Sequence, residues 1–326
     1  MDIDYTPPKA LILDDLVKEL ELEFDSLTSF TKKSLQKKLN VVGKLASIVI
    51  HSSLYLGLVA CSLMYVTMLL LGIPLSGGLI LVFGLISYAV YVFDRVTGFH
   101  EDFINHIERA FFIKKHKPFL LASGILSYAF ALYLLSHVGI SAMLIGSFPF
   151  ISGLLYGTDW IPKKITRKYG RLKEVFLFKN FFIAVFWTVT LVGLCITYSG
   201  IAFDVKVGIV SLFLLVKVFL NTIVFDMRDT EGDKRKNIRT LPVRFGLDST
   251  RKHLMQLNIV FGVLIFLVTV LGFLPKIALF INLITLYTHW YLSQFGKKDL
   301  RYLCDVIVEG EDIVMATFAT VGLMFV

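Results

Sequence analysis

Long apolar runs recur along almost the whole chain after residue 42, and they limit the folds that it can adopt. A membrane-spanning helix needs roughly 20 mainly apolar residues to cross about 30 Å of hydrocarbon. Runs of that kind lie at about 45–70, 75–95, 118–137, 140–159, 175–197, 205–226, 256–273, 276–295 and 305–325. With 56% of its 326 residues hydrophobic, the chain is predicted to be all-α, a polytopic membrane protein with a bundle of about nine transmembrane helices.

Residues 1–41 differ from the rest because they are polar and carry charges of both signs, with no secretory signal expected. The stretch "LDDLVKELELEFDSLTSFTKKSLQKKLN" has apolar residues at helical spacing. It predicts an amphipathic cytoplasmic segment on the membrane surface, whose lysines face lipid headgroups. An ordinary solvated helix or a partly disordered tail fits the same pattern. We therefore expect two domains, this N-terminal segment at 1–41 and a transmembrane domain at 42–326.

The distribution of Lys and Arg predicts the orientation in the membrane. These residues gather before the first span and at 95–117, 163–179, 228–252 and 297–301, while the intervening loops carry one each or none. The positive-inside rule then places the N-terminus and these basic loops in the cytoplasm, and the C-terminus outside. The net charge of +8 is explained by loops that face membrane lipids, so no nucleic acid partner is expected.

Three carboxylates follow the sixth span in the stretch "DMRDTEGD". On an α-helix, Asp226, Asp229 and Asp233 would lie within about 80° of one another. Three anions on one face repel unless a cation lies between them, and Mg²⁺ prefers hard oxygen ligands and keeps room for substrate phosphates. A solvated helix end, neutralised by the following basic residues Lys234, Arg235 and Lys236, is the plainer alternative.

A second acidic stretch, "YVFDRVTGFHEDFINHIER", follows the second span on the same predicted side of the membrane. Its carboxylates Asp94, Glu101 and Asp102 again lie close to one helical face. Acids at the edge of a membrane are functional candidates by default. Two such stretches on one side favour a shared metal site, with Asp94, Glu101, Asp102, Asp226, Asp229 and Asp233 as its candidate ligands.

These residues resemble the UbiA superfamily of intramembrane prenyltransferases. The second family motif, DxxDxxxD, is complete at Asp226, Asp229 and Asp233, and it continues into the expected segment "NIRTLPVRFG". The resemblance covers roughly residues 40–326. It implies an all-α membrane enzyme that uses Mg²⁺ and an isoprenoid diphosphate, with Asp94, Asp102, Asp226, Asp229 and Asp233 as catalytic residues.

The first family motif, NDxxDxxxD, departs from its pattern here, where it reads "DRVTGFHED". Arg95 and Gly98 stand where two carboxylates are expected, and Asp102 is retained. The stretch is similar to a variant branch whose motif reads roughly N-R-x-T-D-x-x-E-D. Either Asp94 or Glu101 compensates for the carboxylate missing at Gly98, or the metals are held differently.

The family chemistry also implies which residues bind the diphosphate. An allylic diphosphate ionises more readily when Mg²⁺ and basic side chains hold the negative charge of the leaving group. Proximity to the acidic motifs selects Arg95, Arg109, Arg228 and Lys234. Similarity to family segments adds Tyr156, Lys163, Lys164, Lys179 and Asn180. For each basic residue, a side chain extended towards the lipid headgroups is the alternative.

Lys217 lies within the sixth predicted span, in "SLFLLVKVFLNTIVF". A lysine near the bilayer centre costs about 2.5–3.5 kcal/mol to insert, so it is expected to pair with an acid inside the bundle. The stretch "VIVEGED" offers Glu309 or Glu311 as that partner.

The predicted function is the transfer of a prenyl group from an isoprenoid diphosphate to a lipophilic acceptor within the membrane. An aromatic ring, a lipid glycerol and another isoprenoid all remain open as acceptors. One alternative is a UbiA-type terpene cyclase, which acts on the prenyl diphosphate alone. A second alternative is a non-catalytic membrane binding protein or transporter, which Arg95 and Gly98 suggest. The intact triad of "DMRDTEGD" argues against it, because a protein without catalysis has no need for three mutually repelling acids.

Overall fold

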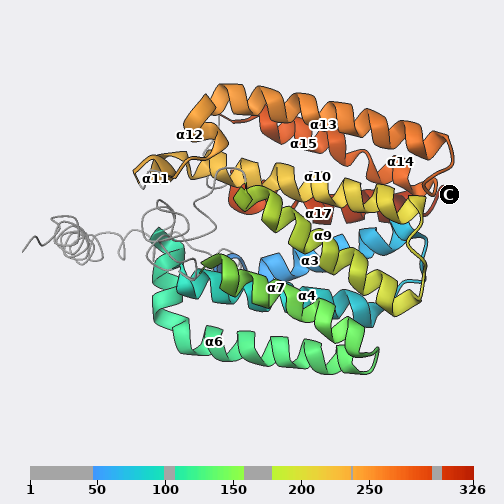
Figure 1. Cartoon of the computed structure of the whole chain (residues 1–326). Helices are drawn as coiled ribbons and strands as arrows, with labels where there is room; N and C mark the ends of the chain where they lie inside the picture. Colours follow the sequence, from blue (N-terminus) through green and yellow to red (C-terminus); the bar gives the residue numbers. More distant parts are fainter. Residues whose placement is uncertain (1–46, 99–106, 158–177, 236–237, 296–302) are drawn as a thin grey trace, which may run out of the picture. The chain divides into compact units, whose positions relative to one another are not determined.

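The structure is a computed structural model, and it describes residues 47–98, 107–157, 178–235, 238–295 and 303–326 (Figure 1). The chain divides into two compact units, Met1–Val49 and Ile50–Val326. The described part of the second unit consists of helices joined by turns and loops and contains no strand, so the prediction of an all-α protein is confirmed. The predicted segment 1–41 lies outside the described residues, and the boundary at 41/42 stays a prediction.

The described helices correspond to all nine predicted segments. They are α3 (Leu54–Leu71), α4 (Gly77–Thr97), α6 (Ile107–Ser136), α7 (Ile140–Gly157), α9 (Phe178–Ser199), α10 (Val205–Arg228), α11 (Thr230–Arg235), α12 (Leu241–Phe245), α13 (Leu247–Val270), α14 (Ile277–Ile281), α15 (Ile284–Ser293), the π-helix η2 (Leu303–Val308) and α17 (Glu311–Gly322). Within the described part, six helices are long and apolar enough to cross a membrane: α3, α4, α6, α9, α10 and α13. The exact number of nine spans is not confirmed, because the apolar stretches Ile140–Gly153 and Ile277–Ser293 are shorter than a span requires.

The helices pack in sequence order and close into a bundle. Helix α4 packs between α3 and α6, and α9 packs between α7 and α10. Helix α13 contacts α10 and α15, and α17 contacts both α14 and α3 (Figure 1). The last helix therefore returns to the first one described, and it brings the end of the chain beside α3.

Two helices begin earlier than hydropathy predicts. Helix α6 starts at Ile107 and runs through Pro118, where the predicted span began, and Figure 1 shows its first part at an angle to the rest. Proline lacks the N–H for the ladder and clashes with the preceding turn, which explains the bend. Helix α13 starts at Leu247, directly after Gly246 at φ 84°, so its polar first turns extend beyond the apolar run.

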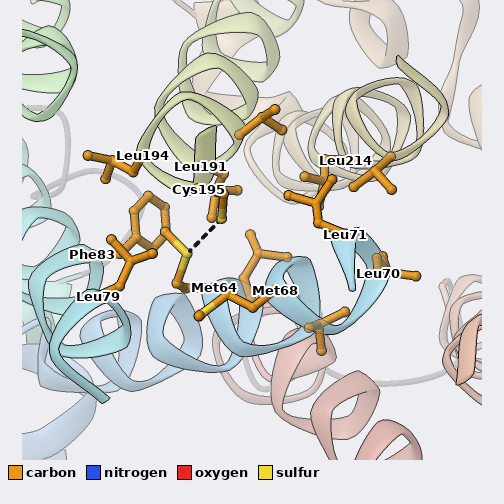
Figure 2. Packing of buried hydrophobic residues seen from close by; sticks show 14 of the residues in the cluster. Met64, Met68, Leu70, Leu71, Leu79, Phe83, Leu191, Leu194, Cys195 and Leu214 are labelled. Atoms are coloured by element: carbon orange, nitrogen blue, oxygen red, sulfur yellow. Dashed lines mark hydrogen bonds between the residues drawn. The ribbon is translucent and has the colours of Figure 1, made fainter. Parts of the chain in front are cut away.

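The core of the bundle depends on close contact between helices α3, α4, α9 and α10 (Figure 2). Met64 of α3 lies against Cys195 of α9, with 3.6 Å between the two sulfur atoms. At Gly84 a Cβ atom would lie 2.3 Å from the Cys61 sulfur and 3.0 Å from the carbonyl oxygen of Gly57. Because lipid tails are as apolar as the core, such dispersion contacts between small residues hold membrane helices together.

The two ends of the bundle are built differently. At one end the chain turns tightly: Gly72 at φ 67° ends α3, and Gly200 at φ 69° ends α9. Asp204 caps α10 there by accepting a hydrogen bond from the Val207 backbone N–H at 2.8 Å. The opposite end collects the end of α4, the start of α9 and the end of α10 (Figure 1). Both predicted acidic stretches therefore follow helices that finish at the same end.

Candidate active site

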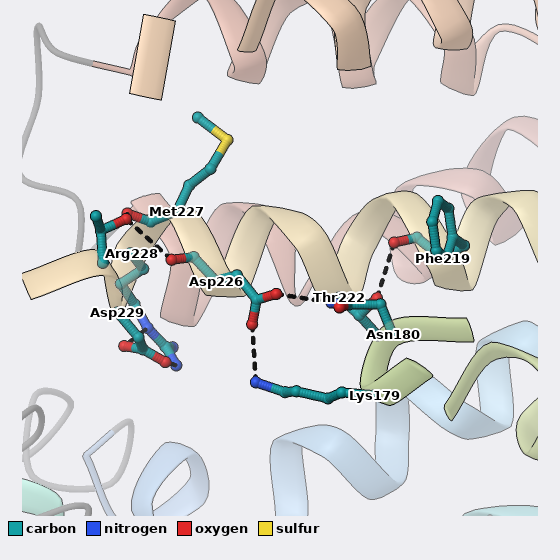
Figure 3. Close-up of polar contacts among 9 residues, drawn as sticks. Lys179, Asn180, Phe219, Thr222, Asp226, Met227, Arg228 and Asp229 are labelled. Atoms are coloured by element: carbon teal, nitrogen blue, oxygen red, sulfur yellow. Dashed lines mark hydrogen bonds and ion pairs between the residues drawn. The ribbon is translucent and has the colours of Figure 1, made fainter. Parts of the chain in front are cut away.

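Asp226 is buried in the last turn of α10 and has a basic and an amide partner on α9 (Figure 3). Its side chain is 2% exposed. Lys179 Nζ donates to Oδ1 at 2.8 Å, and Asn180 Nδ2 donates to Oδ2 at 2.8 Å. The two donors are consecutive at the start of α9, so this helix end fixes both carboxylate oxygens. A buried carboxylate is tolerated when its charge is paired and both oxygens are hydrogen-bonded, as here.

Arg228 forms ion pairs with Asp229, the second acid of the triad, and with Asp305 of η2. Its Nε and one terminal nitrogen donate to the two oxygens of Asp229, each at 2.9 Å. Its other terminal nitrogen donates to Asp305 Oδ1 at 2.7 Å. The guanidinium also lies over the Phe225 ring, 5.0 Å from its centroid. The planar fork of arginine suits this two-oxygen contact with a carboxylate.

Asp233 is the third acid of the triad and has a buried oxygen without a partner. Its side chain is 8% exposed, and Oδ2 accepts no hydrogen bond from any described residue. Burial raises the pKa of the Asp233 carboxyl to about 6, and Lys179 opposes that rise. The charges of Asp226 and Asp229 raise the pKa further, which places the three acids in one electrostatic cluster.

The sequence suggested one uninterrupted helix for the triad, but the structure has two helices there. Helix α10 ends at Arg228, Asp229 is its C-cap residue, and α11 begins at Thr230. Thr230 Oγ1 donates to the carbonyl oxygens of Asp226 and Met227 at 3.0 and 2.9 Å, so it fastens the turn. The Asp233 N–H donates to the Asp229 carbonyl oxygen at 2.9 Å, and this bond connects α11 to the C-cap residue of α10.

The first acidic stretch is described only in part. Asp94 is exposed near the end of α4, and the Gly98 N–H donates to the Asp94 carbonyl oxygen at 2.7 Å. Arg95 is buried and donates to the carbonyl oxygens of Ile50 and His51 at 2.8 and 3.3 Å. Glu101 and Asp102 lie outside the described residues. The meeting of the two acidic stretches therefore stays a prediction.

The remaining predicted residues are distributed unevenly. Arg109 lies half-buried near the start of α6, while Lys234 is exposed and pairs with Glu231 at 3.0 Å. Tyr156 belongs to α7, but its side chain is not described, and Lys163 and Lys164 lie outside the described residues. Of the nine predicted diphosphate ligands, the described contacts bring Lys179, Asn180 and Arg228 directly to the second motif.

Two acids of the last segment were not assigned to the site from the sequence. Asp305 lies on η2 and pairs with Arg228, and Glu309 follows the same π-helix. Glu309 is 9% exposed, and its Oε2 has no partner among the described residues. The positive charges that act on it are those of Arg95, Arg228 and Arg109. The sequence signal that could have identified these two acids is their place in the apolar run "LCDVIVEGED".

Lys217 has the partner that the sequence offered as one of two candidates. Its Nζ pairs with Glu311 Oε1 and donates to Thr288 Oγ1 at 2.9 Å. Thr288 also donates to Glu311 Oε1, and Tyr291 Oη donates to the other oxygen at 3.3 Å. Both charged side chains are under 10% exposed. This network joins α10, α15 and α17 inside the bundle.

The described acids fit a divalent cation in chemistry, although no three His, Cys, Asp or Glu side chains of the described residues are grouped tightly enough to hold one as they stand. Carboxylate oxygen is the ligand that Mg²⁺ prefers. Asp233 offers a buried oxygen that accepts from no described donor, while Lys179 and Arg228 neutralise the other two acids. A cation would thus add to a site whose charges are already partly balanced.

The sequence matches the UbiA prenyltransferase family over residues 75–301. A search of curated proteins gave no match. Among solved structures, a UbiA homologue from Archaeoglobus fulgidus bound to GPP and Mg²⁺ has 15% identity and a TM-score of 0.61, with 85% of this chain and 99% of that chain covered.

Two further solved structures share the fold. The A. fulgidus homologue bound to DMAPP and Mg²⁺ has 15% identity and a TM-score of 0.61, covering 85% of this chain and 98% of that chain. A digeranylgeranylglyceryl phosphate synthase has 16% identity and a TM-score of 0.52, covering 87% of this chain and 99% of that chain. The family match spans more than half of the chain and includes the complete second motif. The chain belongs to the UbiA prenyltransferase family, as an integral multi-pass membrane protein.

Proposed function

We propose that this protein transfers a prenyl group from an isoprenoid diphosphate to a lipophilic acceptor within the membrane, in a reaction that depends on Mg²⁺. The observation that carries the proposal is the cluster at the end of α10, where three acids meet Lys179 and Arg228 beside an apolar bundle. Structures of similar fold bound to GPP or DMAPP with Mg²⁺ support the choice of ligands.

Asp229 and Asp233 are the residues that we expect to hold Mg²⁺ at this motif, with Asp226 beside them. Asp94, Glu101 and Asp102 are the candidates from the first motif. When bound, Mg²⁺ neutralises diphosphate oxygens and so lowers the barrier to loss of the leaving group. Asp226 itself is held by Lys179 and Asn180, so we expect it mainly to orient these donors.

The basic residues act on the leaving group in this proposal. As the bond between the allylic carbon and oxygen breaks, its electron pair goes to the diphosphate. We expect Lys179 and Arg228 to stabilise that developing charge. Their ion pairs with Asp226 and Asp229 hold both side chains in position. We expect the apolar helices to keep water from the prenyl chain, which would protect the allylic cation from hydrolysis until the acceptor attacks.

The donor and acceptor are tested with purified protein in nanodiscs. Labelled prenyl diphosphates of several lengths are incubated with Mg²⁺, with and without a membrane lipid extract, and diphosphate release and labelled products are measured. A labelled adduct that forms only with extract supports transfer. A labelled hydrocarbon formed without extract supports the cyclase instead, and absence of diphosphate release in every mixture contradicts both.

We also propose that the site faces the cytoplasm, because every basic block falls on that side in the predicted topology. The exposed residues Lys115 and Lys252 lie in the first turns of α6 and α13, whose starts are at the same end of the bundle as the site. Gly77 starts α4 at the opposite end of the bundle. In a variant without native cysteines, Cys at 115 and 252 should react with an impermeant maleimide only after permeabilisation, and Cys at 77 in intact cells. The reverse pattern contradicts the orientation.

A further inference from the structure

Arg228 has anionic partners on two separate elements. One is Asp229, its neighbour in sequence, whose two oxygens each accept a bond at 2.9 Å. The other is Asp305 of η2, at 2.7 Å. The Arg228 side chain is only 9% exposed, so its position is set by these contacts and by the Phe225 ring. The second partner comes from a part of the chain that neither acidic motif includes.

Asp305 is carried by a π-helix that is fastened from two sides. Tyr55 of α3 donates its Oη–H to the Val306 carbonyl oxygen at 2.8 Å. Tyr287 of α15 donates to the Ile307 carbonyl oxygen at 3.0 Å. The Glu309 N–H closes the π-helix on Cys304 O at 3.0 Å. Single π-helical turns occur often at functional sites, because they redirect side chains that a regular helix would face elsewhere.

A metal bound to Asp229 would share its carboxylate oxygens with Arg228 and weaken that contact. Both carboxylate oxygens of Asp229 accept bonds from Arg228, and a metal ligand needs at least one of them. If Asp229 were the only anionic partner, release of an oxygen would leave a buried guanidinium poorly paired, which is costly. The contact with Asp305 removes that cost because it is independent of Asp229.

We propose that Asp305 is a positioning residue that holds Arg228 beside the diphosphate site while Asp229 turns to the metal; this inference rests on the proposed function. Glu309 supports the assignment, since a second buried acid of the same segment lies in the field of Arg228. Asp305 of η2, with Glu309 directly after that helix, therefore supplies negative charge that keeps the guanidinium at the site with and without a metal on Asp229.

The test is Mn²⁺ binding to the full-length protein in detergent, with inorganic diphosphate present, followed by the electron paramagnetic resonance of free Mn²⁺. In Asp305→Asn, Asp229 is the one anionic partner left to Arg228 among the described residues, so Mn²⁺ should bind about tenfold more weakly, a coupling common for contacting groups. Asp305→Glu should stay within about threefold of the wild type. Asp248→Asn, which removes an exposed carboxylate paired with Arg251, should bind Mn²⁺ as the wild type does.

A double-mutant cycle separates positioning from a merely structural effect. In an Arg228→Gln background, Asp305→Asn should cause no further loss of Mn²⁺ affinity. Equal losses in both backgrounds overturn the proposal, and so does wild-type affinity in Asp305→Asn. If that variant does not fold, Asp305→Ser takes its place with the same expectations.

Mn²⁺ binding by the wild type also distinguishes failure of the positioning role from failure of the proposed function. Wild-type protein that binds no Mn²⁺ refutes the metal site and the positioning role together. Wild-type protein that binds Mn²⁺, alongside an Asp305→Asn variant of equal affinity, refutes the positioning role alone.

Discussion

Helix α10 carries two charged sites that differ in how completely their groups are paired. Lys217 pairs with Glu311 inside the bundle, and Thr288 and Tyr291 donate to the same carboxylate, so that both oxygens of Glu311 accept hydrogen bonds. Beyond the end of α10, Asp233 of α11 keeps a buried oxygen without any described partner. A closed network favours a structural role, whereas an open oxygen favours a ligand.

The largest effect is expected when the open site loses a carboxylate. Replacement of Asp229 or Asp233 by Ala should lower the rate of diphosphate release by roughly 10²–10³-fold, because charge stabilisation at the leaving group is lost. The rate is measured with a labelled prenyl diphosphate, and detergent extraction and melting temperature report the fold. Asp248→Ala, outside the site, should keep the wild-type rate. Substantial activity in both triad variants would remove the metal assignment.

A substitution in the Lys217–Glu311 network should change the stability of the protein and not its reaction rate. Lys217→Met leaves Glu311 buried without its cation, which should lower the free energy of unfolding by about 3–5 kcal/mol. The rate per folded molecule should stay within about threefold of the wild type. The double variant Lys217→Met/Glu311→Leu should recover most of the stability, because apolar pairs often replace buried ion pairs without loss.

The measurements are the melting temperature in detergent and the rate corrected for folded fraction. A stable Lys217→Met protein that is as inactive as Asp233→Ala would contradict the distinction between the two sites.

The open site should also respond to pH. The pKa of the Asp233 carboxyl is raised to about 6, chiefly by burial, and only its ionised form binds a cation. Mn²⁺ affinity should therefore be constant above pH 7 and fall as the pH drops through 6, to about one tenth at pH 5. The sign follows from competition, since protons and Mn²⁺ bind the same oxygens. Titration of Mn²⁺ without diphosphate checks this, and Asp233→Asn should lack the step near pH 6.

The smallest effect is expected when the first acidic stretch gains a carboxylate. Gly98→Asp restores an acid of the first family motif, and its Cβ would lie 2.9 Å from the Asp94 carbonyl oxygen. A slight backbone shift should then cost about 1 kcal/mol of stability, while diphosphate release stays equal to the wild type or rises. Loss of activity in a folded Gly98→Asp protein would show that the glycine itself is required.

The sequence was sufficient for the fold class and for the second motif. Apolar length alone predicts membrane helices, and the spacing of Asp226, Asp229 and Asp233 predicts an acidic cluster. It was not sufficient for the helix starts at Ile107 and Leu247, because polar first turns lie outside an apolar run. The break at Asp229 is also invisible, since the spacing of a motif does not show where a helix ends.

The acids Asp305, Glu309 and Glu311 have tertiary contacts that a sequence pattern does not identify. Glu309 and Glu311 were equal candidates for Lys217, and nothing in a period of 3.6 residues separates them. In the structure, η2 ends before Glu309, and α17 begins at Glu311. Glu309 consequently lies in the field of Arg95 and Arg228, while Glu311 binds Lys217. A π-helical register also turns Asp305 to Arg228, which no sequence pattern indicates.

The most direct test is an electron cryomicroscopy structure of the protein in nanodiscs with Mg²⁺ and an unreactive prenyl thiodiphosphate. The account predicts Mg²⁺ about 2.1 Å from carboxylate oxygens of Asp229 and Asp233, with the diphosphate bound to it and in reach of Lys179 and Arg228. The Lys217–Glu311 pair should remain closed and unliganded. A diphosphate bound elsewhere, with no ion at Asp229 or Asp233, would contradict the account.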